Sequence, residues 1–232
     1  MTESSKILTP HAIIQVLIVM VLFPLLPIFI SGRWDWWEAW VNAGFIILGF
    51  AISRLLAARM NPDLLVERSR FLRQADAKSF DKILAPILMI LGAVILVVAG
   101  MDRLWNWSHP FSLTLKIIAI LALIIGYALG TYAFLENPFF SGMVRIQAER
   151  GQRVIASGPY RLVRHPGYAS SLFTNLAIPV LLDSSWALIP AFIAIILLAI
   201  RTCLEDRCLQ DELEGYKEYT KRVRYRWIPG IW

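Results

Sequence analysis

The stretch PVLLDSSW, Pro179 to Trp186, decides how often this chain crosses a membrane. It interrupts an apolar region, Tyr168 to Ile200, that is too long for one straight span, because about 20 helical residues cross a bilayer. Asp183, Ser184 and Ser185 are residue types that form turns and cap helices. The interruption therefore predicts a helical hairpin with two short arms.

Four further apolar segments precede this hairpin, and each is long enough for a membrane helix. They are Ala12–Ile30, Trp37–Ala57, Ile83–Met101 and Leu113–Leu135. Only 17% of the residues are charged, against about 25% in an average soluble protein. The sequence thus predicts an all-α, polytopic membrane helix bundle of about six transmembrane helices, followed by a cytosolic C-terminal helix.

The basic residues indicate the orientation of these spans. The N-terminus, the loops Ala58–Lys82 and Glu136–Gly167, and the tail from Arg201 together hold 19 of the 23 lysines and arginines. The positive-inside rule then places both termini in the cytoplasm, which requires an even number of spans. Loop charge of this kind explains the net charge of +6 without a nucleic-acid partner. The compact layout suggests a bacterial inner membrane.

Several functional classes are not indicated. Cys203 and Cys208 lie five residues apart on a predicted helix and point in different directions, which argues against a disulfide. The three histidines are scattered without metal-ligand spacing, so no metal site is expected. The polar start of the chain is unlike a signal peptide, so we expect it to be retained. The loop Ala58–Lys82 could hold either an interfacial helix or a solvated chain with apolar anchors.

The first group of candidate functional residues is GPYRLVRHPGYAS, Gly158 to Ser170. Pro159 favours a turn and Pro166 stops a helix from continuing through His165, so the loop is irregular. Its arginines offer planar donors for carboxylate or phosphate, and its tyrosines offer rings and hydroxyls. Binding of phospholipid headgroups would need the same residue types without any catalysis.

The second group begins at Arg201, where the last span leaves the membrane. Arg201 and Glu205 are four residues apart and share a helix face, while Asp206 lies about 100° further round. A simple surface ion pair is the alternative interpretation. Trp227 and Trp232 could fold back onto this region. Together the two groups favour a pocket for a zwitterionic cofactor.

These motifs resemble a known family. SGPYRLVRHPGY, followed some 35 residues later by R…ED…L…YKEY…V…IP, is similar to the isoprenylcysteine carboxyl methyltransferase and phospholipid methyltransferase superfamily of integral membrane enzymes. The resemblance covers Val144 to Trp232, about two fifths of the chain. It implies N-terminal transmembrane helices over residues 1–136 and a cofactor-binding catalytic region over residues 137–232.

The resemblance implies S-adenosylmethionine as cofactor, in a pocket unlike the Rossmann fold. The sequence agrees in lacking GxGxxG after a strand. The implied cofactor-binding residues are Gln147, Tyr160, Arg164, His165, Tyr168 and Glu205. Arg201 and Asp206 would face the methyl acceptor as catalytic residues, although the family pattern has Glu-Glu where this chain has Glu205-Asp206.

The implied reaction is direct displacement of the methyl group at the cytosolic membrane face. A lipophilic acceptor, a prenylcysteine carboxylate or a phospholipid amine, would arrive through the bilayer. A carboxylate or thiolate would need only orientation by Arg201, whereas an amine would need a base such as Asp206 or Glu205.

Two other functions compete with methyl transfer. Membrane sterol and enone reductases, which use NADPH, resemble the same C-terminal pattern, but their RHPxY motif continues with an Asn and a nearby Glu that RHPGYASS lacks. A non-enzymatic lipid-binding protein would need charges along a membrane pathway. Of the basic residues, only Arg54 and Lys116 lie within predicted spans, near span ends from which they could reach water.

Overall fold

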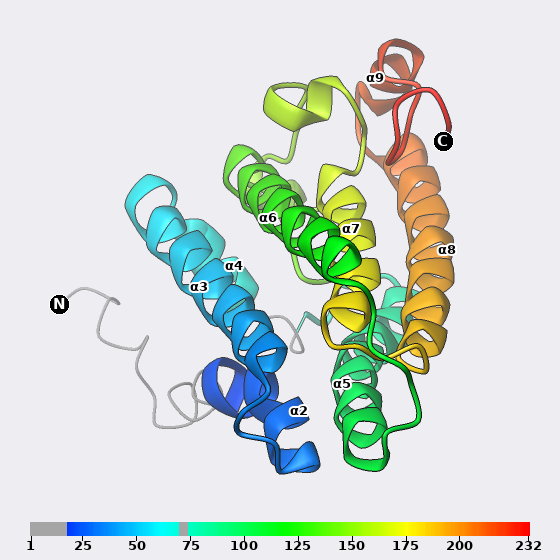
Figure 1. Cartoon of the computed structure of the whole chain (residues 1–232). Coiled ribbons are helices and arrows are strands. Elements are labelled where there is room, and N and C mark those ends of the chain that lie inside the picture. The colour runs from blue at the N-terminus through cyan, green and yellow to red at the C-terminus, as the bar shows by residue number, and fades with distance from the viewer. Residues whose placement is uncertain (1–17, 70–73) are drawn as a thin grey trace, which may run out of the picture.

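The structure is a computed structural model that describes residues 18–69 and 74–232 (Figure 1). This part of the chain is helical and contains no strand. Four of its helices are long and apolar enough to cross a membrane. They are α3 (Trp37–Met60), α5 (Asp81–Trp105), α6 (Leu113–Glu136) and α8 (Leu188–Glu212). The predicted all-α membrane bundle is confirmed to this extent.

The first predicted span begins outside the described residues. Within them, the segment consists of a π-helical turn, η2 (Ile18–Leu22), and the short helix α2 (Phe23–Ser31). Gly32 ends α2 in the left-handed conformation, with φ 64°, and its N–H bonds to the carbonyl of Ile28 at 2.9 Å. That conformation is the usual role of a glycine after a helix. The α2 helix packs on α5 and α3.

The predicted break at PVLLDSSW is present. The α7 helix (Pro166–Leu181) ends just before it, and α8 begins just after it. Asp183 has a positive φ of 55°, and the Ser184 hydroxyl accepts the N–H of Ala187 at 3.0 Å. The arms are unequal, with 16 residues in α7 and 25 in α8. Because α2 and α7 are shorter than a full span, the count of six transmembrane helices stays a prediction.

The helices α6 and α7 pack together at the centre of the bundle. The α7 helix lies between α6 and α8 (Figure 1). Small residues allow this close approach. A Cβ on Gly126 would lie 2.8 Å from Thr174, and a Cβ on Gly130 would lie 2.8 Å from the Ser170 hydroxyl. This packing fixes the start of α7 beside the end of α6, where the loop of the RHP motif begins.

Buried charges occur at the end of the bundle that holds the hairpin turn. Lys116 donates to Glu38 on α3 and, at 2.6 Å, to Asp183 in the turn. All three residues are at most 8% exposed. The position of Lys116 near a span end suggested that its side chain could reach water. The side chain instead turns inward to the two carboxylates. We call Glu38, Lys116 and Asp183 the turn-end cluster.

The opposite end carries the irregular segments. Between α6 and α7 lie two short 3₁₀ turns, η4 (Ala148–Arg150) and η5 (Gly158–Arg161). The short helices α4 (Asp63–Ser69) and α9 (Tyr216–Arg222) precede α5 and follow α8. In Figure 1 the two 3₁₀ turns, α9 and the C-terminus gather at the upper end of the bundle. Cys203 and Cys208 are free thiols, as predicted.

Candidate functional site

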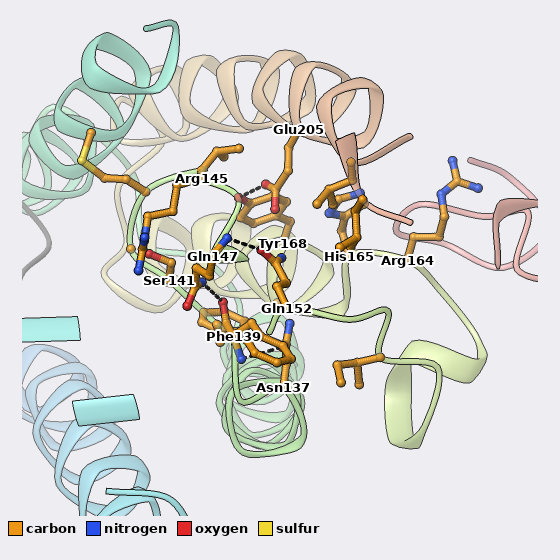
Figure 2. Close-up of a pocket in the computed structure, with 18 of the residues that line it drawn as sticks. Asn137, Phe139, Ser141, Arg145, Gln147, Gln152, Arg164, His165, Tyr168 and Glu205 are labelled. Atoms are coloured by element: carbon orange, nitrogen blue, oxygen red, sulfur yellow. Dashed lines mark hydrogen bonds between the residues drawn. The ribbon is translucent and has the colours of Figure 1, made fainter. Parts of the chain in front are cut away.

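A cavity of about 520 Å³ lies between the α6–α7 loop, the start of α7 and the last turns of α8. Figure 2 shows part of its wall. Seven of the eight predicted site residues line it. They are Gln147, Tyr160, Arg164, His165, Tyr168, Arg201 and Glu205. We call this space the first cavity.

The RHP loop is held in place by the C-terminal tail. The N–H groups of Arg164 and His165 donate to tail carbonyls, of Tyr225 and Arg226 respectively, both at 2.9 Å. Pro166 then starts α7 at a position where its missing N–H costs no helical bond. At the start of α7, the ring of the preceding His165 stacks on that of Tyr168, with centroids 5.6 Å apart and planes 3° apart. The loop thus presents two parallel rings to the first cavity.

Arg164 bonds away from the centre of the cavity, as Figure 2 shows. Its Nε and Nη2 each donate to Asp206 at 2.8 Å. Asp206 is fully buried and also accepts the Tyr216 hydroxyl at 3.0 Å and Arg226 Nε at 3.1 Å. Asp206 does not line the first cavity, and the role facing the methyl acceptor that the resemblance implies for it stays a prediction. Asp206 anchors the RHP loop to α8, α9 and the tail.

Arg201 is paired with a residue that the sequence analysis did not single out. Its Nε and Nη2 donate to the buried Asp81 at 2.6 and 2.8 Å, and its guanidinium lies 5.2 Å from the centre of the Tyr168 ring. The Tyr168 hydroxyl donates to Glu205. Asp81 is an acidic residue just before a predicted span, and this position was the available sequence signal for it. Nothing in the local sequence identifies Arg201 as its partner.

The opposite wall comes from the α6–α7 loop. Gln147, which is 1% exposed, donates its amide to the carbonyl of Phe139 at 2.7 Å. Gln152 accepts the Gln147 N–H at 2.6 Å. Burial raises the pKa of the Tyr160 phenol well above its usual value, and its hydroxyl donates to the carbonyl of Ala133 at 3.2 Å. Phe139 and Gln152 are lining residues that sequence reasoning missed, because no motif marks them.

The tail supports the site from behind. Trp227 Nε1 donates to Thr202 on α8 at 3.1 Å, and the ring packs on Ala169 and Leu198. Trp227 therefore folds back toward the RHP loop as predicted, although it does not line the first cavity. No group of three or more potential metal ligands occurs in the described part of the chain.

Comparison with known proteins agrees with the motif analysis. The model of the Isoprenylcysteine carboxyl methyltransferase (ICMT) family matches residues 117–211. A Delta(14)-sterol reductase of Mus musculus is 31% identical over 137 residues, which are 53% of this chain and 32% of the mouse protein. A probable 7-dehydrocholesterol reductase of Acanthamoeba polyphaga mimivirus is 34% identical over 87 residues, 36% of this chain and 19% of the viral protein.

The matched segment of this chain thus spans about a third or less of each relative's length. The family match runs from α6 through the cavity loop and α7 to nearly the end of α8. It covers all seven predicted residues that line the first cavity, because they fall between residues 147 and 205. Over residues 117–211 the chain carries the sequence pattern of the isoprenylcysteine carboxyl methyltransferase family, as its motifs predict.

Proposed function

We propose that the chain is an integral membrane methyltransferase that uses S-adenosylmethionine and methylates a lipophilic acceptor. The observation that carries this proposal is the charge state of the first cavity. Its arginines are largely neutralised by carboxylates: Arg164 by Asp206, Arg201 by Asp81, and Arg145 by Glu67. The rest of the wall includes the rings of His165 and Tyr168, with Glu205 as a carboxylate beside Tyr168.

S-adenosylmethionine fits such a wall better than a dinucleotide does. Its sulfonium and ammonium groups are cations, which aromatic faces and carboxylates attract. His165 and Tyr168 offer stacked rings, and Glu205 can accept hydrogen bonds from hydroxyl or amino groups. NADPH instead carries several phosphate charges. Of the arginines lining this cavity in the described residues, only Arg68 and Arg153 have no carboxylate partner.

The residues of the chain would act by positioning. The cofactor would supply the methyl group, and near-attack alignment alone lowers a barrier by about 7–11 kcal/mol. Arg201 Nη1, which has no hydrogen bond to another described residue, is the group left to orient an anionic acceptor. An amine acceptor would need a base, and Glu205 is better placed than the buried, fully paired Asp206.

A second candidate function is favoured by the relatives, which are named sterol reductases. An NADPH-dependent reductase would use Arg153, exposed at the cavity wall, and Arg68 to bind phosphate groups. The RHP loop would serve either function, because its backbone is held by the tail and not by the ligand.

The proposal includes an orientation. The first cavity lies at the end of the bundle that carries the basic loops and the tail, so we place this end and both termini in the cytosol. The water-soluble cofactor would then enter from the cytosol, and the acceptor from the surrounding membrane lipids. A bacterial inner membrane is the proposed location.

Isothermal titration of the full chain in detergent tests the cofactor. We expect S-adenosylhomocysteine to bind and NADPH not to bind. His165→Ala should weaken binding at least tenfold, since it removes one stacked ring. The matched control is His109→Ala, which removes an exposed histidine outside the cavity. Binding of NADPH instead, reduced by Arg153→Gln, would replace this proposal with the reductase.

A further inference from the structure

A second cavity of about 350 Å³ lies between α3, α6 and α7. It adjoins the first cavity, because the two share the lining residues Arg68, Phe140, Gly167 and Ser171. None of the eight predicted site residues lines it. The methyl-transfer chemistry described above therefore leaves this space without a role.

The second cavity has a polar end and an apolar end. Arg54 and Arg68 lie at the end that adjoins the first cavity. Ile46 on α3 and Ile178 on α7 line the other end. Ile46 and Arg54 are eight residues apart on one helix, which corresponds to about 12 Å along its axis. A space of this kind matches an amphiphile with a charged group and a hydrocarbon chain.

The two arginines rest on aromatic rings. The Arg54 guanidinium lies 4.8 Å from the Phe50 centroid and 4.9 Å from the Phe134 centroid. The Arg68 guanidinium lies 5.7 Å from the Phe140 centroid. Since the Phe134 and Phe140 rings pack edge to face at 5.6 Å, one aromatic platform supports both cations.

Neither cation is neutralised by the protein. Within residues 18–69 and 74–232, no carboxylate lies at ion-pair distance from Arg54 or Arg68. Arg68 donates to the carbonyl of Ser141 at 3.1 Å, which satisfies one of its N–H groups. Both side chains are partly buried. Charges held away from water are normally paired, because an unpaired charge loses its hydration without compensation.

The electrostatics of Arg68 agree with a missing anion. Burial and the positive charges of Arg54 and Arg201 together lower the pKa of Arg68 to about 10, although the nearby Glu67 acts in the opposite direction. Like charges at close range destabilise each other, whereas a bound anion would relieve both. The protein supplies no such anion at this position in its described part.

We infer that the second cavity binds a membrane amphiphile whose anionic group, a carboxylate or a phosphate, lies between Arg54 and Arg68. Its hydrocarbon chain extends past Ile46 and Ile178 between α3, α6 and α7. The inference goes beyond the proposed function, because it rests on the two arginines of the second cavity and not on the methyl-transfer residues of the first cavity. A neutral sterol would leave both guanidinium groups unpaired. The inference therefore predicts that the cavity prefers anionic amphiphiles to neutral sterols.

Binding of three single-chain lipids to the full protein in neutral detergent tests the inference. The probes are oleate, oleoyl lysophosphatidate and monoolein, which share a chain and differ in headgroup charge. We expect at least one anionic probe to bind ten or more times as tightly as monoolein. The tighter of the two anions then identifies a carboxylate or a phosphate as the group recognised. Equal affinity for all three probes would overturn the inference.

Two variants locate the site. Arg54→Gln and Arg68→Gln should each weaken binding of the preferred anion about tenfold or more, because each removes a charge-assisted hydrogen bond. The matched control is Arg59→Gln, an exposed arginine on the same helix that lines neither cavity. Anion binding that survives both cavity substitutions would also overturn the inference. If Arg68→Gln does not give folded protein, Arg54→Gln alone decides.

Titration of S-adenosylhomocysteine into Arg54→Gln separates this inference from the proposed function. Arg54 does not line the first cavity, so cofactor binding should be unchanged. If the cofactor product binds and no probe is preferred by charge, only the inference fails. If an anionic probe binds and the cofactor product does not, the lipid site stands and the methyltransferase proposal fails.

Discussion

The turn-end cluster and the second cavity both hold charged side chains among apolar helices, yet they treat those charges differently. At the turn end, Lys116 is paired with two carboxylates. In the second cavity, Arg54 and Arg68 have aromatic rings beneath them and no carboxylate partner in the described residues. The first arrangement joins three segments of the chain, and the second leaves charge available to a ligand. The pairing in the turn-end cluster favours a structural role, and the unpaired arginines of the second cavity are the basis for the binding role that we infer.

The largest expected effect comes from breaking the turn-end cluster. Lys116→Met should lower the free energy of unfolding by about 3–5 kcal/mol, because it leaves Glu38 and Asp183 buried without a cation. Chemical unfolding in detergent, followed by tryptophan fluorescence, measures the loss. Neutralising Glu38 and Asp183 in the same protein, with Gln and Asn, should recover much of it. An unchanged unfolding midpoint for Lys116→Met would show that the cluster is not structural.

A smaller effect is expected on ligand binding in the first cavity. Glu205→Gln should weaken binding of S-adenosylhomocysteine by about 1.5–3 kcal/mol, since the lost group is a charged hydrogen-bond acceptor. Calorimetric titration gives the difference, with the exposed Glu214→Gln as control. Equal affinity for the variant and the unmodified protein would remove Glu205 from the cofactor site.

The paired arginine Arg145 gives a pH-dependent prediction. Burial alone would raise the pKa of Glu67, but hydrogen bonds from Arg145 and Ser141 hold it below the ordinary value of 4.5. The stability that this pair contributes is therefore present above pH 4.5 and is lost as the pH falls through the lowered pKa. At pH values below 4.5, the temperature midpoint of unfolding should therefore decrease. The decrease should correspond to a loss of about 1 kcal/mol or less in the free energy of unfolding. In Glu67→Gln this part of the pH dependence should disappear.

The smallest effect is expected at the unpaired charge. Arg54→Met, without ligand, should change the free energy of unfolding by less than about 0.5 kcal/mol. Losing the cation–π contacts destabilises the fold, while removing a partly buried charge offsets that loss. The unfolding assay used for Lys116→Met applies here. A loss as large as that of Lys116→Met would mean that Arg54 has a structural role, and the contrast between the two regions would fail.

Local sequence predicted the parts of the fold that local chemistry controls. The break at PVLLDSSW and the irregular RHP loop depend on turn residues and prolines next to each other in the chain. Six of the seven predicted residues that line the first cavity belong to two compact motifs on segments that pack together, and Gln147 was implied by the family resemblance alone. The matching family pattern covers the same region.

Other features depend on which helices meet, and local patterns do not specify this. Arg201 pairs with Asp81, which lies 120 positions away in the sequence, and Lys116 pairs with Glu38, 78 positions away. Asp206 was expected to face an acceptor, but the helix rotation that directs Glu205 toward Tyr168 turns Asp206 toward Arg164 and Tyr216. The second cavity was not predicted, since its two arginines belong to no motif.

The backbone pairing of the RHP loop with the tail has a consequence for biosynthesis. Arg164 and His165 bond to carbonyls some 60 residues later in the chain. During translation the loop leaves the ribosome before those carbonyls exist. The N–H groups of Arg164 and His165 therefore lack these partners until α8 and the tail have been synthesised. A nascent chain arrested before Tyr225 would carry all the helices of the described residues and yet lack the tail contacts that hold the wall of the first cavity. Completion of the tail would then be the event that makes the membrane-inserted protein competent to bind.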